Sequence, residues 1–237
     1  MQWLRKNIGV LVALTIIVLW FAVLAFQFGW TIDYRHPWTY LAILVMAHLY
    51  TGLFITAHDA MHGVVAPKNK RLNKALGFFT AILFAFNWYP KLFPKHHEHH
   101  RFVATEEDPD FHRGNPNFFA WYFSFAKQYV SLWQIVAMGV TYELLKRVGG
   151  VDRMNLIFYW IVPSLLATFQ LFYYGTFLPH RGEHDNKHQS RSQSKNHLWA
   201  FLSCYFFGYH YEHHNSPGTP WWLLYKEKEK MVAKQEI

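Results

Sequence analysis

The sequence is poor in cysteine and in charged side chains. It has one cysteine in 237 residues, which excludes an internal disulfide framework and a four-cysteine zinc knuckle. Only 16% of the residues are Asp, Glu, Lys or Arg, whereas 52% are hydrophobic and 20% are aromatic. A chain of this length has room for one domain or one compact membrane bundle. We therefore expect residues 1–237 to form a single membrane-embedded domain.

Three charge-free stretches are long enough to cross a bilayer. Residues 8–28 hold no charged side chain, and at 1.5 Å per residue they reach roughly 30 Å, the thickness of the hydrocarbon core. This stretch is too long for the apolar part of a cleaved signal peptide, so we expect it to be retained. Residues 38–56 and 154–178 are also free of charge and carry Trp or Tyr near an end, as interfacial belts do.

The remaining apolar stretches predict a second hairpin and a segment that lies flat. Residues 76–89 are short and have lysines and arginines on both sides, which favours an interfacial or re-entrant segment. The second half of residues 118–142, extended to residues 129–145, is expected to cross and to pair with residues 154–178. Lys146 and its basic neighbours then lie on the side that the positive-inside rule disfavours. The expected fold is all-α, a four-helix transmembrane bundle of two hairpins with both termini in the cytoplasm.

Histidines are the most informative residues. Three clusters, H-D-A-M-H, H-H-E-H-H and H-Y-E-H-H, repeat offsets of three and four, which place imidazoles on one helix face. They contain His58 and His62; His96, His99 and His100; and His210, His213 and His214. Neutral imidazole binds iron, copper, nickel and zinc, and eight ligands exceed what one tetrahedral zinc site takes. The clusters therefore predict two metal ions.

Acidic residues in and after the clusters are candidates for supporting the chemistry. Asp59, Glu98 and Glu212 lie inside the clusters, where they either orient the ligand rings or are ordinary solvated or salt-bridged acids. Asp108 and Asp110 follow the second cluster and are candidates for orienting rings or relaying protons, or for capping the next helix.

Four motifs, in order, resemble the bacterial and cyanobacterial β-carotene ketolases. They are F-I-T-A-H-D-A-M-H-G (54–63), H-H-E-H-H with the downstream E-D-P-D-F (107–111), F-L-P-H-R (177–181), and C-Y-F-F-G-Y-H-Y-E-H-H (204–214) followed by P-W-W (220–222). The three histidine boxes alone resemble the wider superfamily of membrane fatty-acid desaturases and hydroxylases. The resemblance covers residues 47–224. The residues that flank the boxes in these motifs resemble the ketolases in particular.

The resemblance implies a desaturase-like domain with a non-haem diiron centre on the cytoplasmic side of a bacterial inner membrane or a cyanobacterial membrane. It implies that His180 completes the ligand set formed by the boxes, with His184 as a weaker candidate. The implied reaction oxidises the C4 methylene of the β-ionone rings of β-carotene to a ketone by two successive hydroxylations. It uses O2 and electrons from a ferredoxin-like donor, and the partners are the carotenoid and the lipid bilayer, with no nucleic acid.

The other histidines are not expected to be ligands. His48 lies ten residues before His58, about 15 Å along a helix, and is interpreted as a packing residue. Surface or supporting roles are expected for His36, His97, His112, His188 and His197.

Several other functions remain open at this point. A carotenoid ring hydroxylase, or a fatty-acid desaturase or hydroxylase, would use the same histidine boxes, so only its products would distinguish it. A membrane zinc hydrolase needs about three protein ligands and would leave most of these histidines unexplained. A metal transporter would place polar ligands at mid-membrane depth, whereas nearly all the clusters lie beyond the apolar runs.

Overall fold

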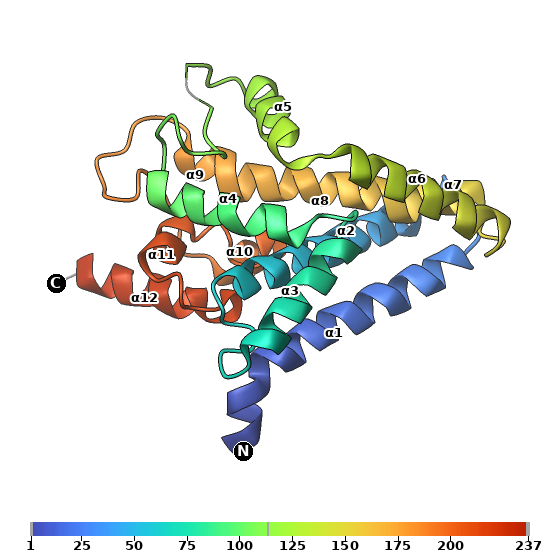
Figure 1. Ribbon diagram of the computed structural model, residues 1–237, viewed down its shortest axis with the longest axis horizontal. Coiled ribbons are helices and arrows are strands. Elements are labelled where there is room, and N and C mark those ends of the chain that lie inside the picture. The colour runs from blue at the N-terminus through green and yellow to red at the C-terminus, as the bar shows by residue number, and fades with distance from the viewer. Residues whose placement is uncertain (1, 113, 236–237) are drawn as a thin grey trace.

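The computed structural model describes residues 2–112 and 114–235, and this part of the chain is helical, without a β-strand (Figure 1). The elements in chain order are α1 (Gln2–Phe28), α2 (Pro37–Met61), α3 (Lys70–Leu83), α4 (Tyr89–Phe102), α5 (Phe118–Tyr129), α6 (Leu132–Arg147), α7 (Arg153–Leu156), η1 (Ile157–Ile161), α8 (Val162–Phe172), η2 (Tyr173–Phe177), α9 (Leu178–His180), α10 (His197–Cys204), α11 (His210–Asn215), η3 (Trp221–Leu223) and α12 (Leu224–Gln235). The predicted all-α class is confirmed.

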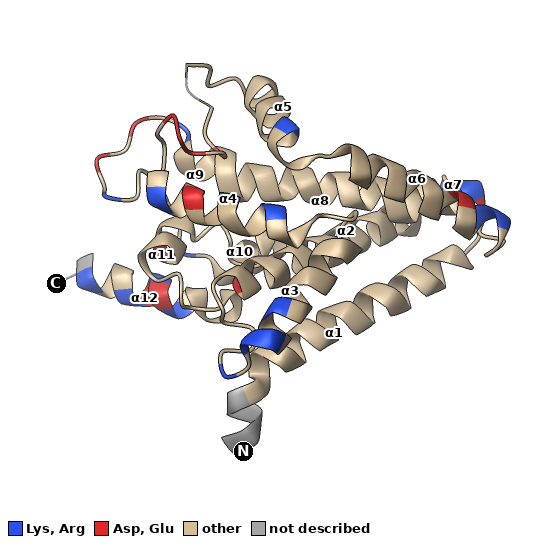
Figure 2. Cartoon of the chain, viewed as in Figure 1, with Lys and Arg blue, Asp and Glu red and all other residues tan. Residues whose placement is uncertain are grey.

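Three helices of the described chain are long and apolar enough to cross a membrane, and they coincide with the three predicted stretches. They are Asn7–Phe28, Pro37–Met61 and Arg153–His180. The third runs without a break through α7, η1, α8, η2 and α9, with two π-helical turns inside it. Lysines, arginines and acids gather towards the two ends of the bundle, and the middles of the long helices carry none (Figure 2).

The stretch 118–142 is divided into α5 and α6, and most of the segment expected to form a fourth span, residues 129–145, lies in α6. The break falls at Ser131, whose side chain accepts a hydrogen bond from the backbone N–H of Gln134 in a capping box that starts α6. With 16 residues, α6 reaches about 24 Å, shorter than a bilayer core of about 30 Å. A crossing by this segment therefore stays a prediction.

The stretch expected to lie flat, residues 76–89, consists of the second half of α3 and the turn that leads into α4. α3 packs closely on α2 at Gly77, where an added Cβ would lie 2.6 Å from the Cβ of Ala60. Ala85 and Phe86 then take left-handed conformations, with φ of 51° and 57°, and reverse the chain into α4. This turn delivers the second histidine box to the end of α2.

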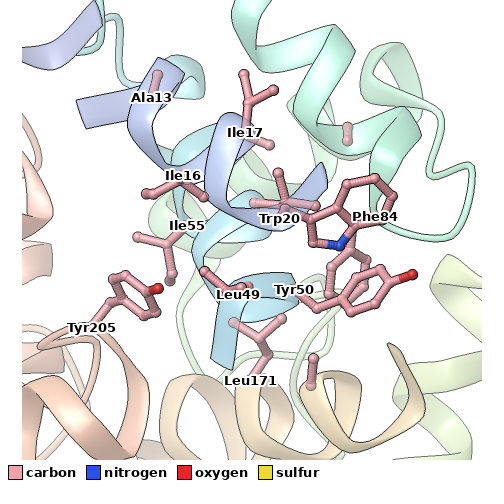
Figure 3. Close-up of a cluster of buried hydrophobic side chains, with 14 of the residues drawn as sticks. Ala13, Ile16, Ile17, Trp20, Leu49, Tyr50, Ile55, Phe84, Leu171 and Tyr205 are labelled. Carbon is pink, nitrogen blue, oxygen red and sulfur yellow. The ribbon is translucent and has the colours of Figure 1, made fainter. Parts of the chain in front are cut away.

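Aromatic packing holds the first two spans together. Trp20 of α1 meets Tyr50 of α2 edge to face, with ring centroids 5.4 Å apart, and Tyr50 meets Phe84 at 5.8 Å (Figure 3). This contact lies inside a continuous apolar core that also takes in Leu171 of α8.

Polar side chains tie the third span to its neighbours. The Asn155 amide donates to the backbone oxygens of Gln27, Phe28 and Trp30 at 3.0, 3.1 and 2.7 Å, and so caps the end of α1. Fifteen residues on, Gln170 accepts from the Thr51 hydroxyl at 2.5 Å. Intramembrane amides of this kind need internal partners, so these bonds fix how the third span sits against α1 and α2.

As a result, the histidine-bearing segments meet at one end of the bundle. The last turn of α2, the helix α4, the end of the third span at α9 and the short helix α11 lie together on the left of Figure 1.

Candidate metal centre

Nine histidines form two buried or half-buried groups at this end of the bundle. Within each group the nearest ring nitrogens all lie within 4.8 Å of one another. The first group is His58, His62, His96, His100 and His213, and the second is His99, His180, His210 and His214. These are the nine histidines expected as ligands from the sequence, although the metal-binding role itself stays a prediction.

The second and third histidine boxes each divide between the two groups. On α4, His96 and His100 join the first group while His99 joins the second. On α11 the numbers are reversed: His213 joins the first group, whereas His210 and His214 join the second. The histidines of each box share one helix face, as the sequence pattern predicts. However, α4 and α11 lie between the two groups, so each of these helices contributes histidines to both.

The nine rings converge through the same atom, Nε2. Six contacts join Nε2 atoms pairwise at 2.7–3.2 Å, among them His62 to His96 at 2.7 Å and His180 to His210 at 2.8 Å. Two nitrogens bound to one metal at about 2.1 Å, at right angles to each other, lie about 3.0 Å apart. The spacing within each group is therefore that of ligands around a common cation.

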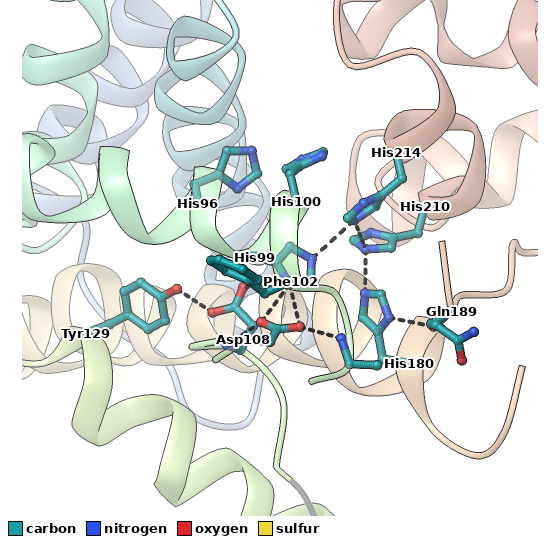
Figure 4. A network of polar contacts seen from close by, with 12 residues as sticks. His96, His99, His100, Phe102, Asp108, Tyr129, His180, Gln189, His210 and His214 are labelled. Carbon is teal, nitrogen blue, oxygen red and sulfur yellow. Dashed lines mark hydrogen bonds and ion pairs between the residues drawn. The ribbon is translucent and has the colours of Figure 1, made fainter. Parts of the chain in front are cut away.

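Hydrogen bonds at the opposite ring nitrogen fix the orientation of several of these rings. His99 Nδ1 donates to the Asp108 carboxylate at 2.9 Å, and His180 Nδ1 donates to the backbone oxygen of Gln189 at 2.9 Å (Figure 4). A ring that carries its proton on Nδ1 presents a lone pair at Nε2, which is the form that binds a metal. The donor set therefore fits two metal ions, one in each group.

Burial and mutual proximity keep most of these rings neutral. The pKa of His100 falls to about 2, and that of His62 to about 4, because burial and neighbouring histidines disfavour the charged form. His99 is the exception. Burial alone would lower its pKa, but the hydrogen bond from its ring to Asp108 and the nearby charge of Asp110 outweigh burial and raise the pKa.

The three aspartates singled out from the sequence all lie beside these groups. Asp59 accepts a hydrogen bond from His58 Nδ1 through Oδ1 at 3.3 Å and another from the backbone N–H of Trp221 through Oδ2 at 2.9 Å. The Asp108 carboxylate also accepts the backbone N–H groups of Ala104 and Asp110, each at 2.9 Å.

Asp110 is a partly buried carboxyl between His99 and Tyr129. Its Oδ2 lies 4.0 Å from His99 Nδ1, and it accepts a hydrogen bond from the Tyr129 hydroxyl. Burial raises the pKa of Asp110 to about 6.

The acids inside the second and third boxes do not orient ligand rings. Glu98 is exposed. Glu212 is buried and pairs with Lys228 of α12 at 3.2 Å, and it also accepts the Ser192 hydroxyl at 2.6 Å. The ion pair between Glu212 and Lys228 could not be predicted from the sequence, because nothing in the local pattern links α12 to the third box.

The histidines that were not expected as ligands lie outside both groups. His36 caps α2, and His197 contacts the Tyr209 hydroxyl at 2.9 Å. His188 comes nearest, with its ring 5.8 Å from that of His214. His184, the weaker candidate ligand, joins neither group.

An apolar cavity of about 370 Å³ ends on the two groups. Its inner end is lined by His58 and His96 of the first group and by His99 and His210 of the second. The cavity follows the third span from Thr176 to Ile161, about 22 Å at 1.5 Å per residue. The other walls come from α2, α5, α6 and the turn before α4.

The far part of the cavity reaches exposed apolar side chains of the bundle. Ile135 of α6 and Leu165 of α8 both line the cavity and are exposed. Leu165 lies near the middle of the Arg153–His180 candidate span, so this part of the cavity lies at mid-length of that helix, far from the histidines.

Together, three helices apolar enough to span a membrane and two histidine groups compatible with a metal site characterise this helical protein. The sequence profile of the fatty acid desaturase family matches residues 35–153 and 137–235. The chain is 41% identical over 227 residues to the β-carotene ketolase of Paracoccus sp. (strain PC1), covering 92% of this chain and 90% of that protein.

Two algal proteins are similarly related. The chain is 39% identical over 234 residues to the zeaxanthin 4-ketolase of Chlamydomonas reinhardtii, covering 92% of this chain and 52% of that protein. It is 40% identical over 197 residues to the β-carotene 4-ketolase of Protosiphon botryoides, covering 79% of this chain and 51% of that protein. The chain thus spans about half the length of these algal relatives. It belongs to the fatty acid desaturase family and, within it, groups with the β-carotene ketolases.

Proposed function

We propose that this protein is a carotenoid 4-ketolase that oxidises the C4 methylene of the β-ionone rings of β-carotene, giving echinenone and canthaxanthin. The observation that carries the proposal is the apolar cavity, which runs from exposed apolar side chains of the long helices to the two histidine groups. The ketolase names of the Paracoccus and algal relatives support the choice of substrate.

The nine histidines would hold two iron ions, which supply the activation of O2 towards a C–H bond. The chain itself positions and shields the substrate: Asp108 and the Gln189 backbone fix ligand rings, and the apolar walls exclude water from the ring carbon. Electrons come from an external ferredoxin-like donor.

The carotenoid oxidation proceeds in two equivalent steps. Each step takes one O2, two electrons and two protons, inserts one oxygen atom into a C4–H bond and releases the other as water. The first step gives an alcohol, and the second gives a geminal diol that loses water to form the ketone.

The test is expression in cells that make β-carotene, followed by pigment chromatography. The wild-type chain is expected to produce ketocarotenoids, and a His180→Ala variant at equal protein level is expected to leave β-carotene unchanged. Ring-hydroxylated pigments without ketones would indicate a hydroxylase instead, and unaltered pigments with new double bonds in membrane lipids would indicate a fatty-acid desaturase. Either result would overturn the proposal.

We further propose that the chain sits in a bacterial inner membrane or a cyanobacterial membrane as two hairpins, with the histidine groups on the cytoplasmic side. The separation of charged residues towards the two ends of the bundle supports this arrangement (Figure 2). Single-cysteine variants at the exposed positions Val148 and Ser194, in a Cys204→Ala background, test it by labelling intact cells and inverted vesicles. Labelling of Val148→Cys from the cytoplasmic side would refute the second hairpin.

A further inference from the structure

The second π-helical turn of the third span lies directly beside the histidine groups. In this turn, η2, an added Cβ on Gly175 would lie 2.2 Å from Cε1 of Phe207. The Phe207 ring in turn lies 4.8 Å from the ring of His58 and 5.6 Å from that of His210. The next residue, Thr176, lines the inner end of the cavity. π-Helical turns inside α-helices often mark functional sites.

Thr176 carries a hydroxyl that the protein leaves unpaired. The residue is 4% exposed, and its hydroxyl has no hydrogen-bond partner among residues 2–112 and 114–235. The other aliphatic hydroxyls that line the cavity donate back to their own helix, Ser164 to the Ile161 oxygen at 2.8 Å and Thr168 to the Ser164 oxygen at 2.9 Å. Thr176 differs from both because it lies in the π-helical turn.

Most other polar atoms near this end are already engaged. Asp110 and Tyr129 are bonded to each other, and the Nε2 atoms of His99 and His210 point into the second histidine group, although Nδ1 of His210 is buried without a partner. The Thr176 hydroxyl lines the cavity and makes no hydrogen bond within the protein, so an oxygen atom placed next to it gains one hydrogen bond.

We propose that Thr176 is a positioning residue that holds the C4 alcohol in place between the two oxidation steps. This inference rests on the proposed ketolase function. The hydrocarbon substrate offers no oxygen, so the bond forms only after the first step has converted the C4 methylene to an alcohol. It retains the alcohol in the cavity for the second step, which yields the diol and, after loss of water, the ketone.

The variants that test this role are Thr176→Val, which keeps the shape and removes the hydroxyl, and Thr176→Ser, which keeps the hydroxyl. Thr80→Val is the matched control, because Thr80 is buried on α3 outside the cavity lining and donates to the Leu76 oxygen. In β-carotene-producing cells, Thr176→Val is expected to raise the ratio of 4-hydroxy to 4-keto products about tenfold, the effect of one lost neutral hydrogen bond. Thr176→Ser and Thr80→Val are expected to keep the wild-type ratio.

A binding measurement on the metal-free protein provides a readout that does not depend on turnover. Titration with β-carotene and with 4-hydroxy-β-carotene, followed by quenching of tryptophan fluorescence, gives an affinity for each. Thr176→Val is expected to weaken binding of the alcohol about tenfold relative to the hydrocarbon.

The outcomes separate the two proposals. Equal weakening for both pigments, or a wild-type product ratio in Thr176→Val, overturns the role of Thr176. If the wild-type chain forms no oxygenated carotenoid at all, the proposed function itself fails.

Discussion

Replacing Asp108 with Asn tests how the protein holds the second histidine group. The carboxylate accepts three N–H groups, from the ring of His99, the backbone of Ala104 and the backbone of Asp110, each at 2.9 Å. An Asn side chain of the same shape has one oxygen and one NH2 group. At least one of the three donors would then face another donor, and the amide would no longer polarise the His99 ring.

The size of the effect follows from these contacts. A hydrogen bond to a charged group contributes about 1.5–3 kcal/mol, and each 1.4 kcal/mol is about a tenfold change in an equilibrium constant. Loss of one such bond therefore weakens metal binding in the second group about 10–100-fold, in line with the usual effect of removing a carboxylate that supports a metal-bound histidine. The first group contains no partner of Asp108 and keeps its affinity.

Metal content under limiting iron is the assay. The wild-type protein is expected to bind two ions per chain and Asp108→Asn about one, with ketone formation reduced in proportion to the loss of the second ion. Asp185→Asn, the same change on an exposed loop, is the matched control and keeps both ions. Two ions bound by Asp108→Asn with wild-type affinity would refute the reasoning.

Three further predictions concern ligands and stability. His100→Ala is expected to lose metal and turnover, whereas His48→Ala, outside both groups, keeps both; equal metal content and product in the two variants would contradict the ligand assignment. Lys228→Met leaves the buried carboxylate of Glu212 without its cation and is expected to lower the free energy of unfolding in detergent by about 3–5 kcal/mol. Adding Glu212→Gln is expected to recover part of this loss, and an unchanged unfolding curve would show that the ion pair does not stabilise the protein. Asn155→Ala removes two amide hydrogens shared among three backbone oxygens, and a loss of about 1–3 kcal/mol is expected by the same measurement, whereas no loss would show that water replaces the cap.

Local sequence was enough to predict the helices and the members of the site. A charge-free run of about 20 residues has few stable alternatives to a membrane helix, so the three long apolar helices were correctly predicted. Offsets of three and four residues fix the angle between side chains around one helix axis, so the histidines that share a face could be read directly. The Ser131 to Gln134 capping box is also a local signal, and it would have predicted the break between α5 and α6.

The partition of the histidines was decided by tertiary structure. Helical periodicity does not specify which neighbours a face meets, and α4 and α11 each lie between the two groups, so His99 and His100 are adjacent in sequence yet serve different groups. The partner of His180 is a backbone oxygen, which leaves no mark in the sequence at Gln189. The cavity likewise depends on the packing of α2, α4, α5, α6, α11 and the third span, which are far apart in the chain.

Local sequence therefore specifies the chemistry available: which segments are apolar enough for lipid, and which imidazoles lie on a common face. Long-range packing assigns that chemistry to its uses: which rings share a group, that Asp108 supports His99 whereas Glu212 pairs with Lys228, and that Thr176 lines a cavity. The difference comes from the range of the interactions. Hydrophobicity and helix geometry act within one segment, whereas metal spacing, buried ion pairs and cavities arise only where segments far apart in the chain meet.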